Sequence, residues 1–136
     1  YFFGDEAAAA AIEAGLRAVI GMIVIGFPSA WAADVDEYFR KGQAVHDQYR
    51  DHPLVTTAFA PHAPYTVDDA ALTRIATLAE ELDCPVHMHV QETADEVEQA
   101  IATNGLRPLR RLQGLGLVTP RLLAVHATCL DPEEMD

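Results

Sequence analysis

The stretch Val86-His87-Met88-His89-Val90-Gln91-Glu92-Thr93 decides the fold class of this chain. Apolar residues alternate with two histidines, the pattern of a β-strand whose His87 and His89 project to one face. Glu92 follows just past the end of this strand, and Thr93, with a glutamate three residues later, forms a capping box typical of a helix start. We therefore predict a strand that leads directly into a helix, with polar side chains at the carboxyl end of the strand.

Similar units lie on both sides of this one. Apolar and β-branched runs predict further strands at 16–25, 54–60 and 122–127, and caps, prolines and 3.6-residue periodicity predict helices at 5–14, 34–51, 66–82, 93–103 and 108–113. The unbroken apolar character of 16–25 is typical of a strand buried on both faces. Asp131-Pro132 predicts the start of one more helix, which the sequence cuts off.

Strands that alternate with helices predict a parallel sheet of the α/β class. The strands start near residues 17, 54, 86 and 122, a spacing close to the roughly 31 residues per unit of an eightfold barrel. Neither GxGxxG nor GxxxxGK[ST] occurs in the sequence, so it lacks both common nucleotide-phosphate cradles. We predict part of a (β/α)8 TIM barrel, with residues 1–136 as the central part of one catalytic domain. The doubly wound open sheet is the alternative, because the same units build both folds.

Composition excludes several classes of partner. The 136 residues contain 9 Lys+Arg against 21 Asp+Glu, a formal net charge of −12, and 50% are hydrophobic. This charge repels nucleic acids and anionic lipid surfaces, whereas the apolar content is sufficient for a folded core. The longest apolar run, at 19–25, is far shorter than a membrane span. Cys84 and Cys129 form neither a disulfide framework nor a CxxC site, and we expect a reducing, cytoplasmic location without a targeting signal.

Four ionisable residues follow three successive predicted strands. His62 lies in the Pro-rich loop after the 54–60 strand, His89 and Glu92 lie at the end of the next strand, and His126 ends the last. Because the carboxyl ends of parallel strands meet at one edge, we expect these groups to form a site. For each histidine taken alone, a hydrogen-bonded core residue is the alternative, and His87 is left without a role.

The residue types in this group favour metal-assisted hydrolysis. Neutral imidazoles suit zinc or iron, which lower the pKa of a bound water, and a nearby carboxylate moves protons. Ser29 lacks a GxSxG context and Cys129 lacks an evident base, which makes a side-chain nucleophile the weaker option. His46 and His52 lie among polar neighbours and are predicted to be solvated surface residues. A catalytic metal takes about three or four protein ligands, so the remaining ligands must come from outside these residues.

Three segments carry a resemblance to a known family. Phe59-Ala60-Pro61-His62-Ala63-Pro64-Tyr65-Thr66, the 86–93 stretch and Ala124-Val125-His126-Ala127-Thr128 resemble, in order and spacing, the amidohydrolase superfamily. The nearest branch is that of the 5-methylthioadenosine/S-adenosylhomocysteine deaminases and related chlorohydrolases. The resemblance covers essentially the whole chain and implies a mononuclear metal hydrolase on a (β/α)8 barrel, of which this chain matches about the third to sixth strands.

The resemblance also implies a role for each candidate residue. His89 matches a metal ligand, with zinc as the expected metal and iron as the alternative. Glu92 matches the carboxylate that contacts the purine, protonates its ring nitrogen and shuttles the proton of the hydrolytic water. His126 matches the catalytic histidine that orients the metal-bound hydroxide, and His62 matches a substrate-binding histidine. The family's first-strand His-x-His pair and its eighth-strand Asp, both metal ligands, have no counterpart here, so we expect a fragment that is inactive when isolated.

Three functions follow from these observations. The first is hydrolytic deamination of 5-methylthioadenosine, S-adenosylhomocysteine or a related aminated heterocycle, a small purine-type substrate. The second is another amidohydrolase reaction, by a guanine, pterin or cytosine deaminase or a triazine chlorohydrolase. The third is a non-catalytic barrel or inactive fragment, in which the same residues form a buried polar network. The sequence leaves open the substrate, the metal and whether the full-length protein is homo-oligomeric.

Overall fold

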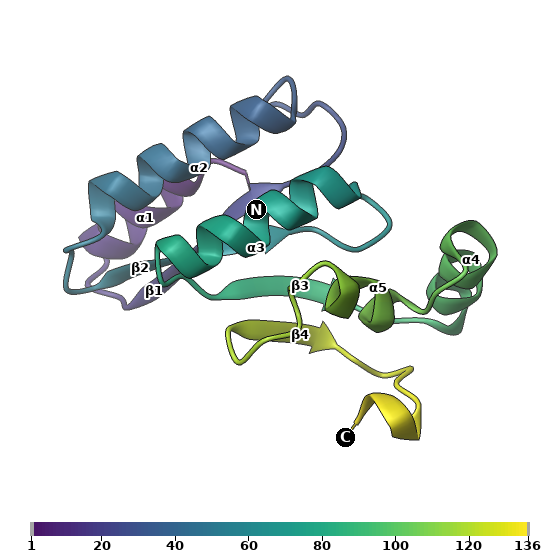
Figure 1. Cartoon of the computed structure of the whole chain (residues 1–136). Helices are drawn as coiled ribbons and strands as arrows, with labels where there is room; N and C mark the ends of the chain where they lie inside the picture. The colour runs from purple at the N-terminus through teal and green to yellow at the C-terminus, as the bar shows by residue number, and fades with distance from the viewer. Residues whose placement is uncertain (1, 136) are drawn as a thin grey trace.

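A computed structural model describes residues 2–135 as a layer of helices on a parallel sheet (Figure 1). Its elements in chain order are α1 (Gly4–Glu13), β1 (Ala18–Val24), α2 (Val35–Tyr49), β2 (Val55–Pro61), α3 (Asp69–Glu81), β3 (Val86–Val90), α4 (Ala94–Asn104), α5 (Pro108–Gly114), β4 (Leu122–His126) and the 3-10 turn η1 (Pro132–Glu134). The four strands are parallel and neighbour one another in chain order, β1-β2-β3-β4. This is the order that consecutive βα units of a barrel produce. The predicted strands and helices are confirmed with small shifts at their ends, except that the helix predicted after Asp131 is the 3-10 turn η1.

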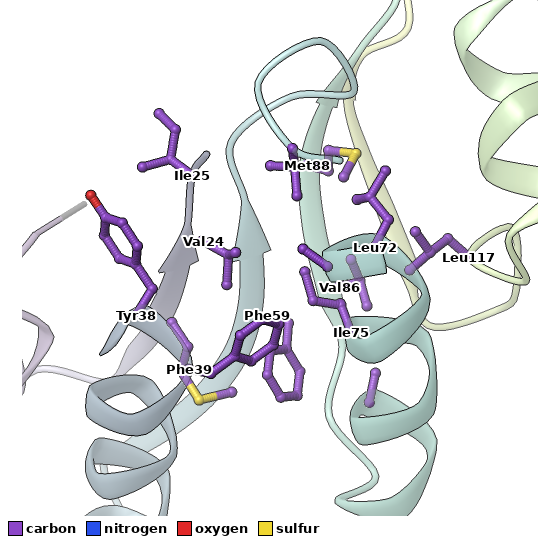
Figure 2. Packing of buried hydrophobic residues seen from close by; sticks show 14 of the residues in the cluster. Val24, Ile25, Tyr38, Phe39, Phe59, Leu72, Ile75, Val86, Met88 and Leu117 are labelled. Atoms are coloured by element: carbon purple, nitrogen blue, oxygen red, sulfur yellow. The ribbon is translucent and has the colours of Figure 1, made fainter. Parts of the chain in front are cut away.

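The core lies between the sheet and the helices that cover one of its faces. Figure 2 shows Phe59 of β2 between Phe39 of α2 and Ile75 of α3, with Met88 of β3 near Leu72. All five side chains are at most 1% exposed. Burying aromatic and branched side chains of this size is the main favourable term that holds the helices on the sheet.

The other face of the sheet is open, which corrects one prediction. β1 alternates, with Ile20, Met22 and Val24 buried, whereas Val19 is 63% exposed. Leu123 of β4 is likewise 54% exposed. The sequence predicted a strand buried on both faces, but the helices cover only one. In a closed barrel the inner face is filled by side chains from the remaining strands.

Side-chain caps explain where most helices begin. The carboxylate of Asp34 accepts the N–H of Glu37 (2.8 Å), and the hydroxyl of Thr93 accepts the N–H of Glu96 (3.2 Å), as the sequence predicts. The start of α3 was predicted at Thr66, but Asp68 caps this helix by accepting the N–H of Ala71 (2.8 Å). Thr66 is instead part of the loop after β2. Among the described helices, none is long and apolar enough to cross a membrane.

One glycine lets β1 approach that loop. The N–H of Gly26 donates to the carbonyl of Thr66 (2.7 Å), and a Cβ at this position would lie 2.8 Å from the same oxygen. Because only a residue without a side chain fits this contact, Gly26 fixes the loop that follows β2 against the end of β1.

Candidate active site

The four residues that the sequence singled out lie together at the carboxyl edge of the sheet. The rings of His62 and His89 have centroids 5.3 Å apart, and His126 stacks on His89 at 5.4 Å with an interplanar angle of 22°. The Nε2 of His126 lies 3.5 Å from the Oε2 of Glu92. β2, β3 and β4 therefore deliver their ionisable groups to one place, although the role of each group stays a prediction.

The tautomer of His89 follows from its hydrogen bond. Its Nδ1 lies 2.7 Å from the carbonyl oxygen of His62. A carbonyl oxygen only accepts, so Nδ1 carries the proton and Nε2 of the neutral ring keeps its lone pair. Metal-ligating histidines commonly donate their other ring nitrogen to a backbone carbonyl in this way. In its neutral form, His89 therefore has the orientation and the tautomer that a zinc ligand needs.

The tautomer of His62 also follows from a hydrogen bond. The hydroxyl of Thr66 donates to the carbonyl of Ala63 (3.1 Å), so its oxygen accepts from Nδ1 of His62 (3.0 Å). The Nε2 of His62 is then free to accept a hydrogen bond. Burial and then the neighbouring His89 lower the pKa of His62 below its usual value, which favours this neutral form. Tyr65, 64% exposed, meets the His62 ring edge-on at 6.2 Å and was not singled out from the sequence.

The backbone at the end of β3 turns Glu92 toward the histidines. His87 is exposed and His89 half-buried on the open face of the sheet, and buried Met88 and Val90 alternate with them. Continued alternation would place residue 91 on the open face. Instead Gln91 adopts a left-handed conformation (φ 52°) and is completely buried, and Glu92 takes the place beside His126. A single unusual backbone conformation therefore decides which of two adjacent polar residues joins the site.

The end of β4 contains a comparable turn. His126 pairs in register with Val90, a fully buried residue. His126 (φ 68°) and Ala127 (φ 51°) are both left-handed, and the His126 ring stacks on His89. Left-handed residues other than glycine are uncommon and cost energy unless the surroundings hold them, and they cluster at functional sites.

The remaining histidines lie elsewhere. The Nδ1 of His46 on α2 is 2.7 Å from the hydroxyl of buried Thr57 and 3.6 Å from the sulfur of Cys84. His46 therefore packs toward the sheet, which corrects the prediction of a solvated surface residue. The Nδ1 of His52 accepts the N–H of Leu54 (3.2 Å) and stabilises the turn before β2.

Among residues 2–135, no group of three or more His, Cys, Asp or Glu side chains could hold a metal ion. His89 fits as one ligand, and a catalytic zinc needs about two more from protein. A cavity of about 560 Å³ lies beside the loop after β2, lined in part by Tyr65, Glu96 and Arg111. None of the four candidate residues lines this cavity. Their polar atoms meet instead on the open face of the sheet.

Sequence reasoning missed a polar cluster below the site. It consists of Gln91, Arg107, Cys129, Asp131 and Glu134, which hydrogen bonds and ion pairs connect. Gln91 was overlooked because a glutamine between a strand and a cap carries no signal by itself. Strand alternation places the side chain of residue 91 on the open face, and the left-handed turn at Gln91 reverses that direction, so the sequence pattern does not reveal its burial.

Known proteins similar to this chain include members of the amidohydrolase family and several deaminases. The model of the amidohydrolase family matches residues 1–136. The chain is 47% identical, over 135 residues, to proteins of Saccharophagus degradans and Teredinibacter turnerae named 5-methylthioadenosine/S-adenosylhomocysteine deaminase. The alignment covers 99% of this chain and 30% of each relative. The chain thus spans about 30% of the length of these curated relatives.

Solved structures agree with this match. An adenosine deaminase from Xanthomonas campestris with bound zinc superimposes with a TM-score of 0.98 and 54% identity, over 99% of this chain and 31% of that one. A guanine deaminase from C. acetobutylicum shares the fold at a TM-score of 0.83 and 16% identity, over 93% of this chain and 32% of that one. The prediction of a partial barrel is confirmed over the open-sheet alternative. Because the family model matches the whole chain, this chain is a member of the amidohydrolase family.

Proposed function

We propose that the protein containing this chain is a metal-dependent deaminase that releases ammonia from adenine nucleosides with a 5′-thioether, 5-methylthioadenosine and S-adenosylhomocysteine. The observation that carries the proposal is that His89, whose Nδ1 is held by the carbonyl of His62, meets the Glu92–His126 pair at the carboxyl edge of the sheet. The names of the relatives at 47% identity support the substrate class. In this proposal residues 1–136 form one continuous part of a single cytoplasmic catalytic barrel.

His89 would hold the metal through Nε2, with zinc as the proposed ion. A bound zinc ion would supply a water molecule whose pKa is lowered towards about 7. The hydrogen bond from Nδ1 to the carbonyl of His62 (2.7 Å) fixes the direction of the Nε2 lone pair. Fixing the ring in this way selects the tautomer and lowers the entropy lost on metal binding.

Glu92 is the proposed proton carrier. Its carboxylate is 49% exposed and lies 3.5 Å from His126 Nε2, so it is open to both water and substrate. It accepts one proton of the attacking water and delivers it to the ring nitrogen beside the amino-bearing carbon, and it then passes the proton of the newly added hydroxyl to the amino group, which leaves as ammonia. Protonation at this nitrogen prevents negative charge from accumulating on the ring as water adds to the carbon.

His126 and His62 are the proposed orienting groups. His126 stacks on His89 and reaches Glu92, so its Nε2 can hydrogen-bond the attacking water. The free Nε2 of His62 can accept a hydrogen bond from a substrate hydroxyl or amine. Exposed Tyr65 lies next to His62 and would offer the substrate an aromatic face.

The test is ammonia release by the complete zinc-loaded protein from a panel of aminated substrates. The panel contains 5-methylthioadenosine, S-adenosylhomocysteine, adenosine, guanine, cytosine, a pterin and an aminotriazine. We expect the highest kcat/KM with the two thioether nucleosides. A preference for guanine, cytosine, the pterin or the triazine would assign the protein to another amidohydrolase reaction. Release from none of them would favour a non-catalytic barrel.

A further inference from the structure

We propose that Gln91 is a positioning residue that locks the loop bearing Glu92 to the loop bearing His126. The inference rests on the proposed function, because it concerns how these two groups are held for proton transfer. Gln91 touches neither of their side chains in the hydrogen bonds of the structure. It acts through the backbone on both sides of the site.

The side-chain amide of Gln91 joins three segments. Its Nε2 donates to the carbonyl of Cys129 (3.1 Å) and to the carboxylate of Glu134 (3.0 Å), both beyond β4. Its Oε1 accepts the N–H of Leu109 in the first turn of α5 (3.0 Å). The amide is completely buried, and three polar partners account for its donors and its acceptor.

The backbone around Gln91 completes the connection. The N–H groups of Gln91 and Glu92 donate to the carboxylate of Glu96 (3.0 and 2.8 Å). The carbonyl of Gln91 accepts the N–H of Cys129 (3.1 Å), and the hydroxyl of Thr128 donates to the carbonyl of Glu92 (2.5 Å). The two loops that present Glu92 and His126 are therefore tied together at several points.

Ion pairs fix the residues beyond β4 to which the Gln91 amide is bonded. The side chain of Glu134 is 0% exposed and lies 2.9 Å from Arg107, which also pairs with Asp131 at 3.2 Å. Arg107 donates in addition to the carbonyl of Cys129 (2.6 Å). Arg107 thus fixes both acceptors of the Gln91 amide, Cys129 and Glu134, in place.

The lock explains why the unusual backbone at the site persists. Gln91, His126 and Ala127 are all left-handed without being glycine, a conformation that needs compensating contacts. Without the Gln91 amide, the end of β3 would relax toward ordinary alternation, which moves Glu92 away from His126. Displacements of about 1 Å remote from the chemistry can lower a rate about 100-fold.

The first test compares Gln91→Met with Thr57→Val in the complete zinc-loaded protein. Methionine has a similar size but no hydrogen-bonding amide. Thr57→Val removes another buried polar group, one bonded to His46 on the helix-covered side of the same sheet and away from the site. We expect Gln91→Met to lower kcat about 100-fold while KM and zinc content stay near wild type, and Thr57→Val to leave kcat unchanged.

A second test exchanges the side chains of positions 91 and 134 and asks whether activity is restored. Gln91→Glu removes the donor and sets two carboxylates against each other, so kcat should fall at least as far as in Gln91→Met. Adding Glu134→Gln restores an amide that can donate across the same pair of positions. We expect the double variant to recover about 10-fold of the lost kcat. No recovery would contradict a direct Gln91–Glu134 interaction.

Amide hydrogen exchange gives a readout that does not need activity. We expect Gln91→Met to speed exchange in both 91–93 and 126–129, and Thr57→Val to leave both unchanged. Wild-type kcat in Gln91→Met, or faster exchange in only one of the two loops, would overturn the proposal. If the wild-type protein deaminates none of the substrates while Gln91→Met speeds exchange in both loops, the proposed function is refuted but the connecting role of Gln91 is retained.

Discussion

Replacing Glu92 with Gln tests the proposed proton carrier most directly. The amide keeps the size of the side chain and can still contact His126, but it cannot accept and return a proton at neutral pH. A single general acid–base group contributes roughly 10²–10⁴ in rate, equivalent to about 2.7–5.4 kcal/mol of activation free energy. The second effect, loss of a pairing with His126 at 3.5 Å, is small. Both side chains are at least 36% exposed, where such a pair contributes about 0–1 kcal/mol.

The assay is steady-state ammonia release by the complete zinc-loaded protein, with zinc measured in the same sample. We expect kcat to fall roughly 10²–10⁴-fold while zinc content is retained, because Glu92 is not the proposed ligand. Wild-type activity in Glu92→Gln would refute the proposed role. Lost activity together with lost zinc would show that Glu92 holds the metal, and the mechanism would need to be rebuilt.

Three other perturbations have clear expected outcomes. His89→Ala should lower zinc content in elemental analysis, and unchanged zinc would exclude this histidine as a ligand. Phe59→Ala should lower the free energy of unfolding by about 3–5 kcal/mol in denaturant titrations, since Phe59 is only 1% exposed; a loss below about 1 kcal/mol would contradict the packing in Figure 2. Burial would raise the pKa of Glu134, but hydrogen bonds from Arg107 and Gln91 outweigh it and lower that pKa. Its stabilising contribution is therefore present above the ordinary glutamate pKa of about 4.3 and is lost as the pH falls below it. Glu134→Gln should flatten that acid loss in unfolding measurements, and an unchanged slope would refute the assignment.

Much of the fold follows from local patterns in the sequence. Asp34 and Thr93 are capping residues whose partners lie three positions away, so the starts of α2 and α4 could be predicted from the sequence. The meeting of His62, His89 and His126 was predictable for a different reason. Parallel strands place their carboxyl ends at one edge, so position along the chain fixes position in space.

What could not be predicted depends on contacts between distant segments. Gln91 is buried because Cys129 and Glu134 lie beside it, and they come about 40 residues later in the chain. The capping role passed from Thr66 to Asp68 because the Thr66 hydroxyl is used by His62. Val19 is exposed because no other strand or helix in the described part of this chain covers its face of the sheet, and the apolar run alone does not tell which segments will cover it.

The hydrogen bond between His89 and the carbonyl of His62 has a consequence for how such a site could change during evolution. The oxygen that fixes the proposed ligand is a main-chain atom, which every amino acid provides. The side chain at position 62, in contrast, faces the space proposed for the substrate. Substitutions at this position could therefore alter which molecule is recognised without disturbing the metal geometry. A single residue thus separates what must be conserved from what is free to diversify.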